Sequence, residues 1–307
     1  MTTNQHHQPA QPWTTGPIPW QSEASGLANG SVPVTAIILA LDEEANIARC
    51  FDTLGWCDQK IMVDSGSTDA TAVIAARHGA EVIDVPVDGF GPMRDRAMRD
   101  PRVRNDWVLF VDADEWISAE LADEIATVLS APRNLGYALR VRLVFRGTWL
   151  RCGGWSGGAL MVRLANKHHA RWTGDVSEKL VVDGPVGLLS SDLVVQDLKR
   201  FGRWLDRHNR YATLKASQRV EWGDRPVRDR WDEAMQASPR SRIPREVMKR
   251  VVAPILPAPG FWRFVYMYVL RGGFLHGTIG LRFSLLHAMQ EMHIQMKIDE
   301  LRREPGK

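Results

Sequence analysis

The sequence is poor in cysteine, in long apolar runs and in charge of one sign. Three cysteines among 307 residues cannot form a disulfide framework and show no C-x-x-C spacing, which is typical of a reducing compartment. No stretch reaches the roughly 18 uninterrupted apolar residues of a membrane-spanning helix. Lys plus Arg total 39 against 36 Asp plus Glu, and this net charge of +3 argues against nucleic acid as a partner.

The N-terminal stretch has little that would specify a fold. It is rich in Gln, Pro, Ser, Thr and Gly, and it carries one charged side chain, Glu23. Because it has neither a basic start nor an apolar segment, we expect a disordered tail over residues 1–31 and no secretory signal. The whole chain is 44% hydrophobic and 24% charged, which is typical of a globular protein.

Charge is unevenly distributed along the chain. Residues 31–130 hold 19 acidic and 8 basic residues, whereas residues 199–250 hold 7 acidic and 15 basic residues. This asymmetry indicates different partners for the two parts.

Apolar runs alternate with helical patterns in the first half of the chain. Strands are predicted over 34–41, 60–63, 81–85 and 107–111, and helices over 43–56, 67–77, within 89–99 and from 118. This order predicts an α/β fold with a doubly wound, mostly parallel sheet. Beyond residue 136, the runs at 137–145 and 159–164 are typical of antiparallel or edge strands. From residue 199 the pattern is helical, first basic and then apolar and amphipathic.

Acidic and polar residues follow the predicted strands where each strand ends. Ligands of such sheets bind beyond the carboxyl ends of the strands. Asp112 and Asp114 are one residue apart on the turn after the fourth strand, so both carboxylates can bind one hard cation, Mg²⁺ or Mn²⁺. Such an ion neutralises a diphosphate leaving group. A solvated acidic turn is the alternative.

Four ordered motifs carry a family resemblance. The segments VTAIILALDEEANI, IMVDSGSTDAT, GFGPMRDRAM and WVLFVDADEW resemble the family 2 glycosyltransferases of GT-A fold. Within that family the chain looks most like the bacterial branch that adds a sugar, often glucose, to lipopolysaccharide core or related envelope glycans. The resemblance covers roughly residues 33–303. It implies a GT-A catalytic domain over 32–198 and a helical, amphipathic region over 199–307.

The resemblance also implies roles for individual residues. The donor, a UDP-sugar, would lie against residues of the first four motifs: Leu39, Leu41, Glu43, Asp64, Ser65, Arg94, Asp112, Ala113 and Asp114. Among them, Arg94 would face the diphosphate, and Asp112 and Asp114 would bind the metal ion. Relatives commonly carry a histidine shortly before the helix at 199–216, where this chain has Gln196.

A general base is needed by an inverting transferase to take the proton of the acceptor hydroxyl. The segment GDVSE looks like the family's segment that ends in a glutamate, which makes Glu178 the candidate base and Asp175 its rival. The acceptor implied by the resemblance is an envelope glycan or glycolipid.

The C-terminal apolar stretch, residues 251–289, mixes aromatic residues and arginines and is interrupted by Pro and Gly. This composition favours a helix in the interface of an anionic membrane. A helix that packs onto the protein core is the alternative. We therefore expect a cytoplasmic protein, peripheral at the cytoplasmic face of the inner membrane.

Two other functions compete with glycosyl transfer. Nucleotidyl transfer uses a similar sheet and metal, but it typically needs a Gly-rich phosphate loop after the first strand, where ALDEEANI has none. A non-catalytic scaffold recruited to membranes by residues 199–290 would bind liposomes without binding a donor.

Overall fold

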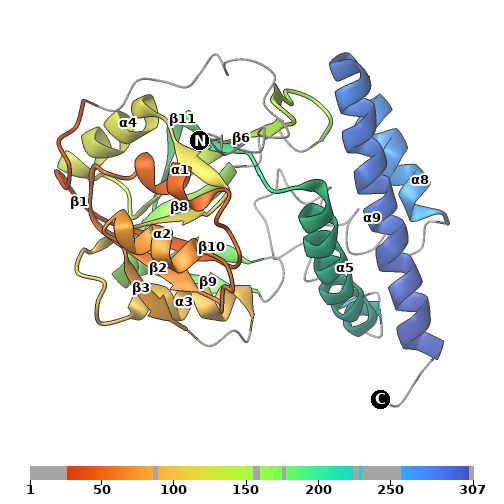
Figure 1. Cartoon of the computed structure of the whole chain (residues 1–307), viewed down its shortest axis with the longest axis horizontal. Coiled ribbons are helices and arrows are strands. Elements are labelled where there is room, and N and C mark those ends of the chain that lie inside the picture. The colour runs from red at the N-terminus through yellow and green to blue at the C-terminus, as the bar shows by residue number, and fades with distance from the viewer. Residues whose placement is uncertain are drawn as a thin grey trace, which may run out of the picture. The chain divides into compact units, whose positions relative to one another are not determined.

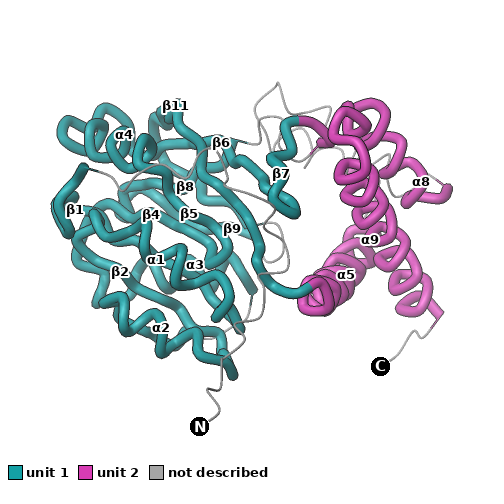
Figure 2. The backbone as a smooth tube through the Cα atoms, turned by 45° about the horizontal axis from the view of Figure 1, so that its top comes forward, with its two compact units in different colours: residues 1–151, 158–200 teal, residues 152–157, 201–307 magenta. Residues whose placement is uncertain are grey.

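The computed structural model describes residues 26–85, 89–154, 160–174, 178–223, 228–229 and 257–303 (Figure 1). The chain divides into two compact units (Figure 2). Unit 1 comprises residues 1–151 and 158–200, and unit 2 comprises residues 152–157 and 201–307. The predicted α/β class with a helical C-terminal region is confirmed.

The first four predicted strands form the parallel half of the sheet in unit 1, in the order β3-β2-β1-β4. They are β1 (Val32–Ala40), β2 (Cys57–Asp64), β3 (Glu81–Asp84) and β4 (Trp107–Asp112). The apolar run of β1 is buried along nearly its whole length, because this central strand has neighbours on both sides and helices on both faces. The carboxyl ends of these four strands therefore share one edge of the sheet.

The second half of the sheet is mixed and continues from β4 in the order β8-β6-β11-β5. These strands are β5 (Glu115–Ile117), β6 (Gly136–Phe145), β8 (Leu160–Asn166) and β11 (Val186–Val195), with the short β7 (Thr148–Trp149) beside β6. Strand β6 pairs antiparallel with β8 and parallel with β11, so it is an interior strand. A separate hairpin joins β9 (Ala170–Thr173) to β10 (Lys179–Val182), and a 3₁₀ turn, η1 (Lys167–His169), precedes it.

Helices cover both faces of the sheet, as a doubly wound topology requires. They are α1 (Ile47–Asp52), α2 (Thr71–Arg77), α3 (Phe90–Arg99) and α4 (Ala119–Ser130). Helices α1, α2 and α4 pack on one face, and α3 packs on the other together with the β9–β10 hairpin. Helix α4 begins where the sequence predicts it, since the Ser118 side chain accepts a hydrogen bond from the Leu121 N–H at 3.2 Å.

Helix α1 is shorter than the predicted helix over 43–56. Residues 43–46 form a turn instead, closed by backbone hydrogen bonds from Asn46 and Ile47 to the Glu43 carbonyl. This turn leaves the side chains of residues 43 to 46 at the carboxyl edge of the sheet.

Unit 2 is helical within the described ranges. It contains α5 (Phe201–Gly223), α8 (Pro259–Phe264), a π-helical segment η5 (Val265–Leu270), a 3₁₀ turn η6 (Gly273–His276) and α9 (Gly277–Arg303). Helices α5 and α9 pack through Ala212, Ala216, Ile294 and Ile298. None of the helices in the described part of the chain is long and apolar enough to cross a bilayer.

Candidate active site

The candidate site residues gather where β1, β2 and β4 end. In the parallel register, Leu39 of β1 lies opposite Asp112 of β4, and Ala40 lies opposite Asp64 of β2. The sheet therefore brings Asp64 and Asp112 to one edge, as the sequence predicts. The turn that carries Asp114 follows directly after β4.

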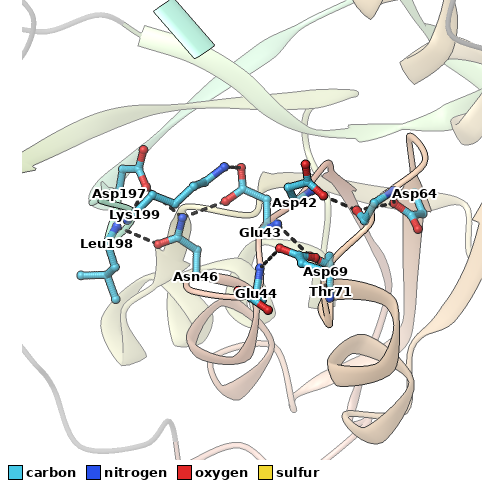
Figure 3. Close-up of polar contacts among 11 residues, drawn as sticks. Asp42, Glu43, Glu44, Asn46, Asp64, Asp69, Thr71, Asp197, Leu198 and Lys199 are labelled. Carbon is cyan, nitrogen blue, oxygen red and sulfur yellow. Dashed lines mark hydrogen bonds and ion pairs between the residues drawn. The ribbon is translucent and has the colours of Figure 1, made fainter. Parts of the chain in front are cut away.

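The loops after β1 and β2 interlock through short hydrogen bonds (Figure 3). The Asp42 N–H donates to Ser67 Oγ at 3.0 Å, and the Asp42 carboxylate accepts from the Thr68 N–H at 2.8 Å. Asp42 has a φ of 52°, a left-handed conformation that non-glycine residues seldom adopt. The Asp64 carboxylate accepts from both the N–H and the hydroxyl of Ser67. These contacts fix the loop on which the predicted nucleotide-binding residues lie.

The turn before α1 is tied to the same loop. The Glu43 N–H donates to Thr71 Oγ1 at 2.7 Å, and the Glu44 N–H donates to Asp69 Oδ2 at 3.2 Å. The Asp69 carboxylate also accepts from the Thr71 N–H. Burial works against ionisation of Asp69, but the hydrogen bonds from Thr71 and Glu44 outweigh it and lower its pKa.

Glu43 is a buried carboxylate at the centre of this region. Its side chain accepts a hydrogen bond from Asn46 Nδ2 at 2.8 Å and pairs with Lys199 Nζ at 2.6 Å (Figure 3). Burial and the nearby Asp114 carboxylate raise the pKa of Glu43 to about 7, although Lys199 and Asn46 oppose the shift. Glu43 and Asp114 thus belong to one concentration of negative charge.

A short segment after β11, residues 196–199, closes one side of the region. The Gln196 N–H donates to the Asp114 carbonyl at 2.9 Å, and the Gln196 side chain accepts from Arg49 Nη1 at 3.0 Å. Asn46 holds the next two residues: its Nδ2 donates to Asp197 Oδ1 at 3.0 Å, and its Oδ1 accepts from the Leu198 N–H at 2.8 Å. The segment brings Gln196 and Lys199 to the carboxylate turn.

The carboxylate turn itself is held by two buried arginines. Arg94 Nη2, from α3, donates to Asp112 Oδ1 at 2.6 Å, and Arg163 Nη2, from β8, donates to Asp112 Oδ2 at 3.0 Å. Arg163 Nη2 also donates to Glu115 Oε1 at 2.9 Å. On its other side, Arg94 Nη2 lies 3.5 Å from Glu178 Oε1. The candidate base is therefore linked to Asp112 through Arg94.

Burial and the neighbouring charges shift the pKa values of Asp112 and Glu115. Burial favours the neutral form of Asp112, but Arg94 and Arg163 outweigh it and hold the pKa of Asp112 well below its usual range. Glu115 is also paired with Arg163, yet burial and the Asp112 charge raise the pKa of Glu115 to about 8. Asp112 is therefore ionised at neutral pH.

The donor set at the turn fits a hard divalent cation. It offers carboxylate oxygens, the ligands that Mg²⁺ and Mn²⁺ prefer, and each Asp112 oxygen keeps a lone pair beyond its arginine contact. Among the described residues, no group of three or more His, Cys, Asp and Glu side chains is placed to hold a metal ion. Magnesium suits such a turn, because it commonly takes one or two carboxylates and completes its shell with phosphates and water.

The remaining predicted residues have varied positions. Leu39 lies in β1, Leu41 follows it, and Ala113 is buried in the turn. The Ser65 N–H donates to the Ala40 carbonyl at 3.0 Å, which places Ser65 at the same edge. Asp175 lies outside the described residues. All these assignments to donor, metal or base stay predictions.

Several polar residues of the site are absent from the sequence-based prediction. They are Arg49, Arg163 and Lys199. Arg163 carried a signal, since an arginine inside the apolar run LMVRL needs buried partners. No such sequence signal marks Lys199, because it begins a basic stretch that is typical of a solvated helix face.

Residues 35–157 match the family model described as glycosyl transferase family 2. This stretch contains most of β1, all of β2 to β4, the interlocked loops and the carboxylate turn. These residues are a family 2 glycosyltransferase domain. The domain match ends before β8, so Arg163, Glu178 and the segment 196–199 complete the site from outside it.

Curated relatives extend this result. The family 2 domain is similar to an uncharacterized glycosyltransferase of Rickettsia typhi, with 36% identity over 37% of this chain and 40% of that protein. The chain is also similar to the lipopolysaccharide core biosynthesis glycosyltransferase LpsC of Rhizobium meliloti, with 28% identity over 64% of this chain and 74% of LpsC. The chain thus spans about 40% of the length of the Rickettsia relatives that it matches.

Among solved structures, glucosyl-3-phosphoglycerate synthase of Mycobacterium tuberculosis, in complex with Mn²⁺, uridine diphosphate and glucosyl-3-phosphoglycerate, is 26% identical. The match covers 37% of this chain and 44% of that chain at a TM-score of 0.31.

Glu43→Gln is expected to flatten the pH dependence of stability. A carboxyl whose pKa is raised on folding contributes stability fully below its unfolded pKa, and this contribution is lost as the pH rises through about 7. Between pH 4.5 and 7, the free energy of unfolding of the wild type should fall by on the order of 1–3 kcal/mol more than that of the variant. Urea denaturation across this range measures the difference.

Glu44→Gln provides the control, because Glu44 is the adjacent carboxyl and is exposed. Its curve should follow that of the wild type. Parallel curves for the wild type and Glu43→Gln would contradict the assignment.

Proposed function

We propose that this protein is an inverting glycosyltransferase that moves a sugar from a UDP-sugar to a lipopolysaccharide-core or other envelope glycan acceptor. The observation that carries the proposal is the carboxylate turn at the carboxyl edge of the sheet, with Arg94 between Asp112 and Glu178. A nucleotide-sugar transferase needs at one place a site for a diphosphate, a countercharge and a carboxylate base. Similarity to glycosyltransferases over the family 2 domain supports the same conclusion.

In this proposal the nucleoside lies over the interlocked loops, against Leu39, Leu41, Glu43, Asp64 and Ser65. These residues border the ends of β1 and β2, where open α/β sheets bind their ligands. Arg94 faces the diphosphate. It suits this role because its guanidinium group lies beside both Asp112 and Glu178, and a guanidinium offers the charge and forked donors that a diphosphate binds.

Asp112 and Asp114 would hold Mg²⁺ or Mn²⁺. When bound, such an ion supplies positive charge that stabilises the departing diphosphate. The chain's own residues supply the rest: Arg94 and Arg163 keep Asp112 ionised, and the segment 196–199 holds the turn through the Asp114 carbonyl.

Glu178 is the proposed general base. Its side chain is about one-fifth exposed, and its Oε1 lies 3.5 Å from Arg94 Nη2, so it borders both the proposed diphosphate site and solvent. In a single displacement, Glu178 takes the proton of the acceptor hydroxyl as that oxygen attacks the anomeric carbon on the face opposite the diphosphate. Asp175 is the rival base.

The proposed acceptor follows from the similarity to LpsC, which is named for lipopolysaccharide core biosynthesis. Glucose is the first donor sugar to test, because the resemblance of the motifs is to glucosyl-transferring enzymes. Nucleotidyl transfer predicts pyrophosphate release from a sugar phosphate and a nucleoside triphosphate. A scaffold predicts no heat when UDP and Mn²⁺ are titrated into the protein.

We also place the protein at the cytoplasmic face of the inner membrane, with unit 2 as its contact with anionic lipid. Support comes from large apolar side chains that are exposed on α8, η5 and η6, among them Trp262, Leu270 and Leu275. Arg263 and Arg271 occur in the same segment. Aromatic and aliphatic residues next to arginines suit an anionic membrane interface.

Asp114→Asn is expected to lower turnover of UDP-glucose by about 100-fold or more, because a bound divalent cation contributes several kcal/mol to the transition state. Release of UDP with and without an envelope-glycan acceptor is measured in Mn²⁺ and in Mg²⁺. Asp123→Asn, an exposed aspartate of α4, is the matched control and should keep wild-type turnover. Full donor turnover by Asp114→Asn would refute the metal assignment.

Glu178→Gln is expected to lower kcat about 100- to 10,000-fold, the range for loss of a general base. The KM for the donor should change little, because the base acts on the acceptor hydroxyl. Asp175→Asn should keep most of the activity. The reverse pattern would make Asp175 the base.

Leu270→Glu with Leu275→Glu is expected to weaken binding to anionic vesicles by at least about tenfold, since each leucine loses apolar area that the interface would bury. Co-sedimentation with vesicles of phosphatidylglycerol and phosphatidylethanolamine measures the binding. Leu270 and Leu275 are 72% and 67% exposed, and Leu188 of β11, 59% exposed, gives the control Leu188→Glu. Equal sedimentation of the three proteins would contradict the proposed contact.

A further inference from the structure

Arg163 is a buried cation of β8 that the transfer chemistry does not use directly. Its side chain is 4% exposed, and strand β8 runs antiparallel beside β4. A guanidinium group in such a place must have anionic partners. Its partners are the ionised Asp112 and the carboxyl group of Glu115, because its Nη2 donates to Asp112 Oδ2 at 3.0 Å and to Glu115 Oε1 at 2.9 Å.

Glu115 contacts both Arg163 and Asp112. Its Oε1 takes the hydrogen bond from Arg163, and its Oε2 accepts from the Asp112 N–H at 2.8 Å. Glu115 is itself fixed at the start of β5, which pairs with β11 opposite Val195. Asp112 is thus held at its backbone by Glu115 and at one carboxylate oxygen by Arg163.

Arg94 connects Asp112 to the candidate base, Glu178. Arg94 Nη2 donates to the second oxygen of Asp112 at 2.6 Å and lies 3.5 Å from Glu178 Oε1. The side chains of Glu115, Arg163, Asp112, Arg94 and Glu178 therefore form one chain in which carboxyl and guanidinium groups alternate. It begins in the core and ends at the base, and each link is a direct contact.

We propose that Arg163 and Glu115 are positioning residues that fix the Asp112 carboxylate and, through Arg94, its separation from Glu178. This inference rests on the proposed function. Stability alone is a weak explanation, because a buried ion pair can often be replaced by apolar residues without loss of stability. What apolar residues cannot supply is the orientation of Asp112 between two guanidinium groups.

The contacts of Arg94 show how Arg163 limits the movement of Asp112. Asp112 engages only Nη2 of Arg94, and the Nε and Nη1 of this buried side chain have no hydrogen-bond partner in the part of the chain that the structure describes. If Arg163 did not hold the other oxygen, Asp112 could rotate and engage more of the Arg94 donors. Arg163 therefore keeps Asp112 on a single donor of Arg94.

The test is Arg163→Lys, which keeps the positive charge and removes the planar group that reaches both carboxylates. We expect kcat for transfer from UDP-glucose to fall about tenfold to a hundredfold, the cost of misplacing reacting groups by about 1 Å. The KM for the donor should stay within about threefold of the wild type, because the nucleoside contacts are unchanged. Calorimetric binding of UDP with Mn²⁺ should keep a stoichiometry near one, which shows that the sites are folded.

Two further proteins separate positioning from stability. Arg171→Lys changes an arginine of the same unit that forms an exposed ion pair with Asp183, and it should keep wild-type kcat. The double variant Glu115→Leu with Arg163→Met removes the buried pair as a whole. It should melt close to the wild type and still have a low kcat.

The inference is overturned if Arg163→Lys keeps wild-type kcat, or if kcat in these variants falls only in proportion to the melting temperature or the binding stoichiometry. Absence of turnover in the wild type would refute the proposed function, and this inference with it. If the wild type is active and Arg163→Lys has the same kcat, the positioning role is refuted, but the proposed function is not.

Discussion

The position of Asp112 between two guanidinium groups is the constraint on which the rest of the candidate site depends. A parallel sheet collects the ends of its strands at one edge, and here those ends carry Glu43, Asp64, Asp112 and Asp114. Such a concentration of carboxylates would repel itself if it were unbalanced. Arg94, Arg163 and Lys199 supply the balancing charge from three separate parts of the chain. The fold can therefore keep acidic groups together at the edge where a phosphorylated ligand would arrive.

Much of unit 1 could be predicted from the sequence, because its signals are local. The apolar run of β1, the strand ends at Asp64 and Asp112, and the Ser118 cap all depend on neighbouring residues. The length of α1 could not be predicted in this way. The turn at Glu43 is stabilised by Thr71, which lies 28 residues away, and by Lys199, which lies 156 residues away.

The residues of the candidate site also differ in whether local sequence signals predict them. Residues that end a strand, such as Asp112 and Asp114, are recognisable from their place in the pattern. Partners that come from distant strands are not, because nothing local in the sequence says that Arg163 will lie beside β4 or that residues 196–199 will close on Asn46. From the sequence, Gln196 is recognisable only as a residue that replaces the histidine common in relatives. The hydrogen bond from its N–H to the Asp114 carbonyl shows that it lies at the site.

The strand order has a consequence for how the protein is made. Strand β5 follows directly after the carboxylate turn, but in the strand order it is separated from β4 by β8, β6 and β11. It pairs with β11, which ends at residue 195. A nascent chain that has emerged only through residue 157 contains the whole family 2 match, yet it lacks β8, β11 and the segment after them. Long-range pairing of this kind forms late and slowly. During synthesis on the ribosome, the acidic turn therefore has Arg94 as a counterion but lacks the full set, which includes Arg163 and Lys199, until some 40 further residues have been translated.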